Sequence, residues 1–80
     1  MQESYYVVLY SSSAEMRDAV YDLRLKYNNS IEDIHNYYVW AKIKLTNGKL
    51  LCLINEMVFD QWQRGRHYQV INKDRISCVI

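Results

Sequence analysis

The chain has 80 residues, half of them hydrophobic and 14% aromatic, with two glycines and no proline. This composition indicates one folded domain over residues 1–80 and excludes a disordered chain or a long flexible linker. The formal net charge of +1 is far below the basic excess typical of proteins that bind duplex DNA.

Residues 4–10 predict a strand. Both of its alternating sets are apolar or aromatic, so we expect it inside a sheet with both faces covered. Ser12, followed three residues later by Glu15, matches a capping box and predicts the start of a helix. That helix should end at about Lys26 or Tyr27. Its apolar stripe is formed by Met16, Val20, Leu23 and Tyr27.

A second, shorter helical turn is predicted over residues 30–34, because Ser30 and Asp33 repeat the capping spacing. Asn47-Gly48 then lies between two strand-forming runs, residues 38–45 and 49–58. Asn-Gly is the preferred pair for a two-residue type I′ turn, since both central residues need a positive φ. We therefore predict a β-hairpin.

The hairpin register decides which side chains share a face. A two-residue turn pairs Ile43 with Cys52 on the face that meets the helix. Their neighbours on this predicted core face are Ala41, Leu45, Leu50 and Ile54. The opposite, outer face carries Tyr38, Trp40, Lys42, Lys44, Leu51, Leu53 and Met57.

Beyond the hairpin the period of two is lost over residues 59–65, which predict a short helix or turn that ends at Gly65. Residues 66–71 and 76–80 predict a second strand pair. The fold class is α+β: a small, mostly antiparallel sheet with one main helix packed on it, in the order β-α-β-β-(short α)-β-β. A competing topology places the first strand parallel to a neighbour through a right-handed crossover.

The chain lacks a recognisable motif for catalysis, metal binding or a cofactor. Cys52 and Cys78 form no Cys-x-x-Cys pair and have no zinc spacing with His35 or His67, so two buried, inert thiols are expected. We expect no enzyme activity, no cofactor and no small-molecule substrate.

The pattern Ile43-x-Leu45-x-Asn47-Gly48 is followed by Arg64-Gly65-Arg66 and by Tyr68-Gln69-Val70-Ile71. It resembles part of the ATPase core of phage large terminases and related helicases, over the last half of the chain. The phosphate-binding loop of that family is absent, and Asn72-Lys73 stands where the family has an acidic pair. The resemblance therefore does not imply ATPase activity.

A second resemblance rests on Asn47-Gly48-Lys49-Leu50 and on Lys73-Asp74-Arg75-Ile76-Ser77. These segments are similar to the strand pattern of Sm-like RNA-binding barrels. That family begins with its helix, whereas this chain begins with a strand.

The outer hairpin face has three interpretations. Its exposed apolar and aromatic side chains favour docking of a partner protein or of a second copy of the chain. Its interleaved aromatic and lysine side chains are also typical of a single-stranded RNA or DNA platform. Alternatively, residues 59–70 fold over this face and bury it. The predicted partner-binding residues are Tyr38, Trp40, Lys42, Lys44, Leu51, Leu53, Met57, Arg64 and Arg66.

The sequence thus favours a small binding protein without catalytic activity, a regulator, adaptor or inhibitor of the kind that phages and mobile elements carry. A single-stranded nucleic-acid-binding domain is the alternative. No apolar stretch reaches the roughly 18 residues that a membrane-spanning helix needs, and no signal peptide is recognisable. We therefore expect a cytoplasmic protein without a membrane partner, in the host cytoplasm if its source is viral.

Overall fold

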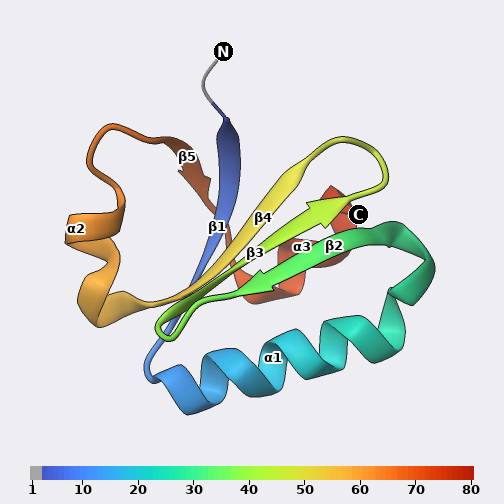
Figure 1. Cartoon of the computed structure of the whole chain (residues 1–80), viewed down its shortest axis with the longest axis horizontal. Helices are drawn as coiled ribbons and strands as arrows, with labels where there is room; N and C mark the ends of the chain where they lie inside the picture. Colours follow the sequence, from blue (N-terminus) through green and yellow to red (C-terminus); the bar gives the residue numbers. More distant parts are fainter. Residues whose placement is uncertain (1–2) are drawn as a thin grey trace.

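The computed structural model describes residues 3–80 and centres on a five-stranded mixed sheet (Figure 1). The strand order is β2-β3-β4-β1-β5. The strands are β1 (Ser4–Tyr10), β2 (Ile31–Asn36), β3 (Trp40–Leu45), β4 (Leu50–Asn55) and β5 (His67–Val70). The helices are α1 (Ser13–Lys26), α2 (Phe59–Trp62) and α3 (Ile76–Val79), with 3₁₀ turns η1 (Asn28–Ser30), η2 (Glu56–Val58) and η3 (Lys73–Arg75).

The α+β class is confirmed, but the prediction of a mostly antiparallel sheet is wrong. Strand β1 pairs in parallel with both β4 and β5, while β3 is antiparallel to β2 and β4. The expectation that residues 4–10 lie inside the sheet is confirmed, since β1 has a neighbour on each edge. Parallel neighbours need long connections, and the chain between β1 and β4 supplies one through α1 and the β2–β3 hairpin.

Helix α1 begins as its capping residue predicts. The Ser12 hydroxyl accepts a hydrogen bond from the Glu15 backbone N–H at 3.1 Å, which satisfies one of the free donors of the first turn. Met16, Val20 and Leu23 are buried against the sheet, and Tyr27 packs beside them. The predicted stripe is confirmed.

The short helical turn predicted over residues 30–34 is wrong, because Ser30 ends the 3₁₀ turn η1 and residues 31–34 begin strand β2. A bulge interrupts the pairing of β2 with β3 between Ile31 and Asp33. The extra residue of a bulge brings side chains three apart onto one face, so both Ile31 and Ile34 pack against the core. Their spacing is helical although the segment is a strand.

The prediction of a final strand over residues 76–80 is also wrong. Ile76 and Val79 are three apart on one turn of α3, where both are buried in the core below α1. The Asn47 side-chain amide donates to the Val79 carbonyl oxygen at 2.9 Å, which ties this end of the chain to the hairpin turn. Gly65 has a φ of +72° after α2, as predicted for a helix-ending glycine, and β5 lies within the predicted residues 66–71.

The turn at Asn47-Gly48 contains three residues rather than two. Leu45 donates its N–H to the Lys49 carbonyl oxygen at 3.0 Å, and Gly48 donates to the Leu45 carbonyl oxygen at 3.0 Å. Gly48 has a φ of +89°, whereas no non-glycine residue among residues 3–80 has a positive φ. Only one residue of the turn is left-handed, as in a type I turn closed by a glycine bulge.

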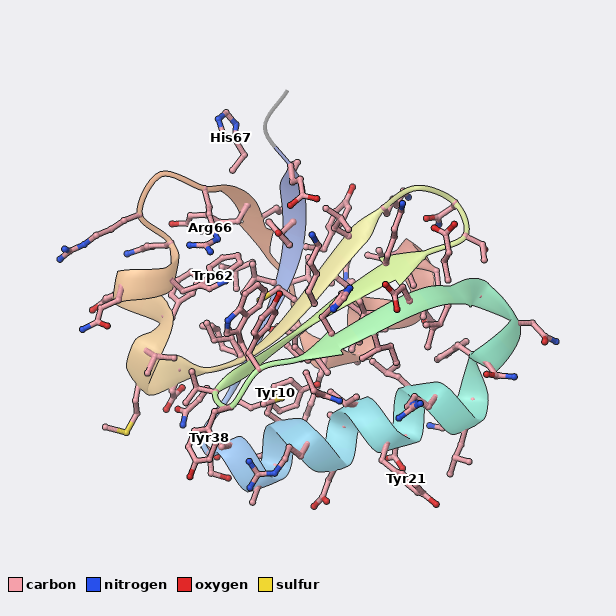
Figure 2. All side chains as sticks on the ribbon, viewed as in Figure 1. Tyr10, Tyr21, Tyr38, Trp62, Arg66 and His67 are labelled. Atoms are coloured by element: carbon pink, nitrogen blue, oxygen red, sulfur yellow. The ribbon has the colours of Figure 1, made fainter. Side chains whose placement is uncertain are left out.

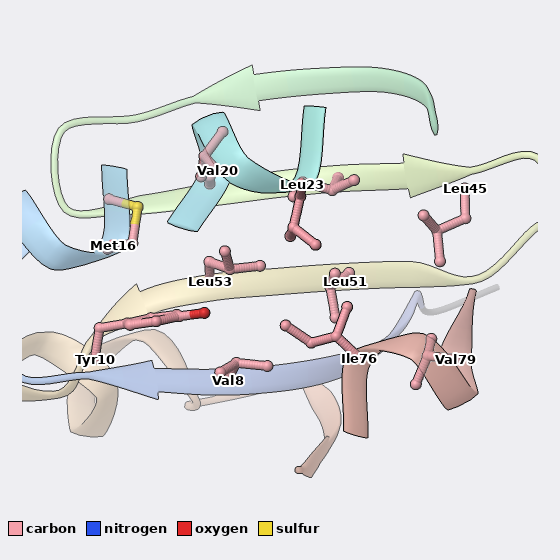
Figure 3. Packing of buried hydrophobic residues seen from close by; sticks show 12 residues of the cluster. Val8, Tyr10, Met16, Val20, Leu23, Leu45, Leu51, Leu53, Ile76 and Val79 are labelled. Atoms are coloured by element: carbon pink, nitrogen blue, oxygen red, sulfur yellow. The ribbon is translucent and has the colours of Figure 1, made fainter. Parts of the chain in front are cut away.

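This extra residue shifts the hairpin register by one and exchanges the two faces of β4. Ile43 now pairs with Leu51, and Ala41 with Leu53. Both leucines are fully buried beneath α1 (Figure 3). Cys52 stays buried but lies on the opposite face from Ile43, so the predicted register is wrong.

Each face of the sheet therefore has its own core. We call the cluster beneath α1 and α3 the aliphatic side; its buried members are Val8, Tyr10, Met16, Val20, Leu23, Ala41, Ile43, Leu45, Leu51, Leu53, Ile76 and Val79. We call the cluster next to α2 the aromatic side; its buried members are Tyr5, Val7, Leu50, Cys52, Ile54 and Trp62, with Leu9, Trp40, Val58 and Phe59 packed against them.

Candidate binding surface

Trp62 is the centre of the aromatic side. Its ring meets Tyr5 and Trp40 edge to face, with ring centroids 5.2 and 5.6 Å apart. Phe59, one turn earlier in α2, stacks on Trp62 at 6.1 Å, and Tyr68 of β5 packs against Phe59 at 5.3 Å. The segment from α2 to β5 thus covers the middle of the face that the sequence interpretation placed outside.

Arg66 packs over the two tryptophan rings of the aromatic side. Its guanidinium carbon lies 4.9 Å from the Trp62 ring centroid and 5.7 Å from that of Trp40. One of its terminal nitrogens, Nη1, donates a hydrogen bond to the Trp62 carbonyl oxygen at 2.7 Å. A guanidinium held over two indole faces gains cation–π stabilisation, so the structure uses Arg66 to hold the aromatic side together.

The two lysines of the predicted interface are paired with carboxylates. The Lys42 ammonium nitrogen lies 3.1 and 3.0 Å from the two Glu3 carboxylate oxygens, and the Tyr5 hydroxyl donates to the same carboxylate at 2.9 Å. The hydrogen bond from Lys42 lowers the pKa of Glu3, and the same bond raises the pKa of Lys42. Lys44 lies 3.5 Å from a carboxylate oxygen of Glu32.

The nine predicted partner-binding residues therefore do not form one surface. Leu51 and Leu53 lie in the aliphatic side with no exposed area, which corrects their placement on the outer face. Trp40 is half-buried in the aromatic side, and Arg64 is exposed after α2. Tyr38 and Met57 stay strongly exposed, each at 83%.

These two exposed side chains come from the same end of the sheet. Tyr38 lies in the connection between β2 and β3, next to Val39. Met57 lies two residues after Asn55. The Asn55 N–H donates to the Val39 carbonyl oxygen at 3.0 Å. The large exposed apolar side chains of the predicted interface are thus limited to the end of the hairpin, beside the first half of α1 (Figures 1 and 2).

A groove of about 510 Å³ runs between α1 and the β2–β3 connection at this end. We call it the loop groove; it is lined by Arg17, Val20, Tyr21, Arg24, Asn36, Tyr37 and Tyr38. Figure 2 shows Tyr38 beside the start of α1 and Tyr21 further along the same helix. Tyr21, Tyr37 and Tyr38 are all exposed, so the lining of this groove combines three exposed tyrosines with two arginines.

The wall opposite α1 is held in place. The Tyr37 ring stacks on Trp40 with centroids 4.5 Å apart and planes 14° from parallel. The Tyr37 N–H also donates to the Trp40 carbonyl oxygen at 2.8 Å. The aromatic side thereby fixes one wall of the loop groove, and Tyr38 extends beyond it into solvent.

Sequence reasoning missed Arg17, Tyr21, Arg24 and Tyr37 as binding candidates. The first three recur at i, i+4 and i+7, which places them on one stripe of the helix. This spacing could be recognised in the sequence. The position of residues 36–38 opposite this stripe could not, because it depends on the order of the strands.

The other flank of α1 has the opposite charge. Glu15, Asp18 and Asp22 line a second groove of about 500 Å³ between α1 and the C-terminal turns, together with Asp74 and two lysines, Lys26 and Lys73. Tyr10 also lines this groove, and burial next to the Glu15 carboxylate raises its pKa to about 12. Helix α1 is therefore basic and aromatic on one flank and acidic on the other.

The cysteines differ from each other. Cys52 is buried, and burial raises the pKa of its thiol well above the ordinary value, so it is inert in the native state. Cys78 is exposed on α3, which corrects its predicted place in a buried strand. Among residues 3–80, no cluster of three or more histidine, cysteine, aspartate or glutamate side chains is arranged to hold a metal ion.

No family model, curated protein or solved structure matches this chain. None of the helices formed by residues 3–80 has the length and apolar character needed to cross a membrane.

Proposed function

We propose that this protein is a non-enzymatic binding protein that docks a protein partner through the loop groove. The observation that carries this proposal is the convergence of three exposed tyrosines with Arg17 and Arg24 on one concave surface. Tyrosine and arginine are enriched among the residues that carry most of the binding energy of protein interfaces. Tyrosine supplies a large contact area with only two rotatable side-chain bonds, and arginine supplies five N–H donors. Regulator, adaptor and inhibitor are the roles that fit such a module.

Pre-organisation supports the same proposal. Because Tyr37 is already stacked on Trp40, a partner does not need to order this wall of the groove, which lowers the entropic cost of association. Met57 lies at the same end of the sheet and adds exposed apolar surface. Methionine is also enriched in protein interfaces.

Single-stranded RNA or DNA is the second candidate ligand. It is favoured by the absence of any carboxylate among the residues that line the loop groove, and tyrosine rings are suitable for base stacking. Against it, the groove offers only two cations among residues 3–80, and Lys42 and Lys44 of the hairpin already have carboxylate partners. A protein partner is therefore the stronger proposal.

The test is capture of partners by the tagged full chain from extracts of its source cells, with and without nuclease, compared among wild type, Tyr38→Ser and Leu25→Ser. Leu25 is a matched control, because it is an exposed apolar residue of α1 that does not line the groove. We expect Tyr38→Ser to lose a captured protein that Leu25→Ser retains, with unchanged circular dichroism. Equal capture by both variants contradicts the proposed site. Loss of capture after nuclease treatment indicates nucleic acid instead.

A second copy of the chain as the partner is tested in the same preparations. Light scattering after size exclusion measures the mass of wild type and of Tyr38→Ser. A dimer that becomes a monomer in Tyr38→Ser identifies self-association through the loop groove. If wild type and Tyr38→Ser are both monomers, the partner is a different protein.

A further inference from the structure

We infer that the loop groove binds an extended acidic peptide segment, with carboxylates of the peptide paired to Arg17 and Arg24. This inference rests on the proposed function and names the chemistry of the partner. It follows from the charge, spacing and shape of the groove.

The charge of the groove is of one sign. Among residues 3–80, Arg17 and Arg24 are the only charged residues that line it, and neither guanidinium forms an ion pair there. The carboxylates of α1 at positions 15, 18 and 22 line the groove on the other flank. An anionic segment is therefore attracted to the loop groove and repelled from the opposite side of the same helix.

The spacing of the two arginines suits an extended chain. Seven residues separate them on α1, which corresponds to about 10.5 Å along the helix axis. Two carboxylates three residues apart in an extended peptide of polyproline II conformation lie on the same side of the peptide, about 9 Å apart. Each arginine can then meet one carboxylate through paired hydrogen bonds, while Tyr21 lies between them and contacts the intervening apolar side chain.

The shape of the groove also favours a single peptide strand. Residues 36–38 form a wall opposite α1, and Tyr37 within it is fixed by Trp40. A single extended chain fits between two such walls, whereas a flat protein surface cannot reach the base of the groove. A longer nucleic-acid strand that continued past Arg24 would meet Glu32 and Asp33, which line the next groove together with Arg24, and like charges oppose it there.

The experiment measures fluorescence anisotropy of a labelled peptide with the repeat Glu-Phe-Gly, which places a carboxylate at every third residue. The full-length protein is titrated into this probe, into the matching Lys-Phe-Gly peptide and into labelled oligothymidine. We expect binding of the glutamate peptide only. The double variant Arg17→Ala/Arg24→Ala should weaken it by at least about tenfold, which is about 1.4 kcal/mol.

Arg64→Ala/Arg75→Ala is the matched control, since it removes the same charge from two exposed arginines that do not line the loop groove. Unchanged affinity in this control supports the inference. Equal weakening in both double variants shows attraction by net charge and overturns it, as does a lack of binding by the glutamate peptide. Tighter binding of oligothymidine that is lost in Arg17→Ala/Arg24→Ala overturns it in favour of nucleic acid.

Failure here is distinguishable from failure of the proposed function. If Tyr38→Ser still loses its captured protein while the glutamate peptide does not bind, the groove is a protein interface with a non-acidic partner. If capture is also insensitive to Tyr38→Ser, the proposed function fails as well.

Discussion

The two sides of the sheet are covered in different ways. The aliphatic side lies beneath α1, a 14-residue helix with a hydrogen-bonded N-cap, and beneath α3. The aromatic side lies beneath α2, which has only four residues, and beneath the guanidinium of Arg66. Six buried residues form the aromatic side, against twelve on the aliphatic side.

This difference in cover assigns stability mainly to the aliphatic side and connects binding with the aromatic side. A long helix that is packed on an aliphatic core resists local opening. A short helix with few buried contacts opens at a lower free energy than the whole domain. The loop groove is connected to the thinner cover, because Tyr37 stacks on Trp40 and Trp40 packs against Trp62. Ligand binding should therefore affect the order of the aromatic side and leave the aliphatic side unchanged.

The largest loss of stability is expected from Leu53→Ala. Leu53 is completely buried beneath α1, and truncation of such a residue removes buried apolar area and leaves a cavity, at a cost of about 2 to 5 kcal/mol. Urea unfolding followed by circular dichroism measures this change. If Leu53 instead lay on an outer face, as the two-residue turn predicts, the loss would be close to zero.

Leu25→Ala is the control for that measurement. Leu25 is on α1 but 67% exposed, so its truncation should change the free energy of unfolding by less than about 0.5 kcal/mol. A similar loss in both variants would mean that any leucine-to-alanine change weakens the protein, whatever its side of the sheet.

A smaller loss of stability is expected from Ser12→Ala, which removes the N-cap of α1 and leaves the side chains that pack on the aliphatic side unchanged. The variant removes the hydroxyl that accepts from the Glu15 N–H, and loss of an N-cap typically costs about 1 kcal/mol. Ser12→Asp restores an acceptor at the same place and should recover most of that loss. Equal destabilisation by alanine and aspartate would show that the cap is not the cause.

Trp62→Phe is expected to have a still smaller effect on the aromatic side. The buried Trp62 indole N–H has no acceptor among residues 3–80, and a buried donor without an acceptor costs about 1 to 3 kcal/mol. Phenylalanine removes this donor but also some buried area, so the two changes oppose each other. We expect a net change within about 1 kcal/mol in urea unfolding. A loss of several kcal/mol would show that the packing of the indole ring outweighs the cost of its unpaired N–H.

Helix α1 could be predicted from the sequence because its signals are local. Ser12, Glu15 and the apolar stripe lie within one segment, and their spacing alone specifies a cap and a buried face. The bulge in β2 shows the limit of this approach. Ile31 and Ile34 are spaced as on a helix, and only pairing with β3 makes them a strand.

The faces of the predicted hairpin interface could not be predicted, because they depend on one residue in a turn. Asn47-Gly48 is compatible with a two-residue or a three-residue connection, and the observed turn is held partly by Asn47 and the Val79 carbonyl oxygen, far along the chain. The slip of one residue moves Leu51 and Leu53 from a predicted interface into the core. The loop groove likewise forms only when β2 and β3 bring residues 36–38 opposite α1.

The smallest effect is expected from Lys42→Gln, at the edge of the aromatic side. Lys42 holds Glu3 by a close ion pair, but exposed ion pairs contribute no more than about 1 kcal/mol. Because the Lys42 hydrogen bond lowers the pKa of Glu3 in the folded protein, this contribution is present above the unfolded pKa of Glu3. It is lost as the pH falls through the lower, folded value. The difference in melting temperature between wild type and Lys42→Gln should thus be small at pH 7 and should vanish well below pH 4.5. A difference that persists in acid would show that packing of the lysine stem, and not the ion pair, stabilises this edge.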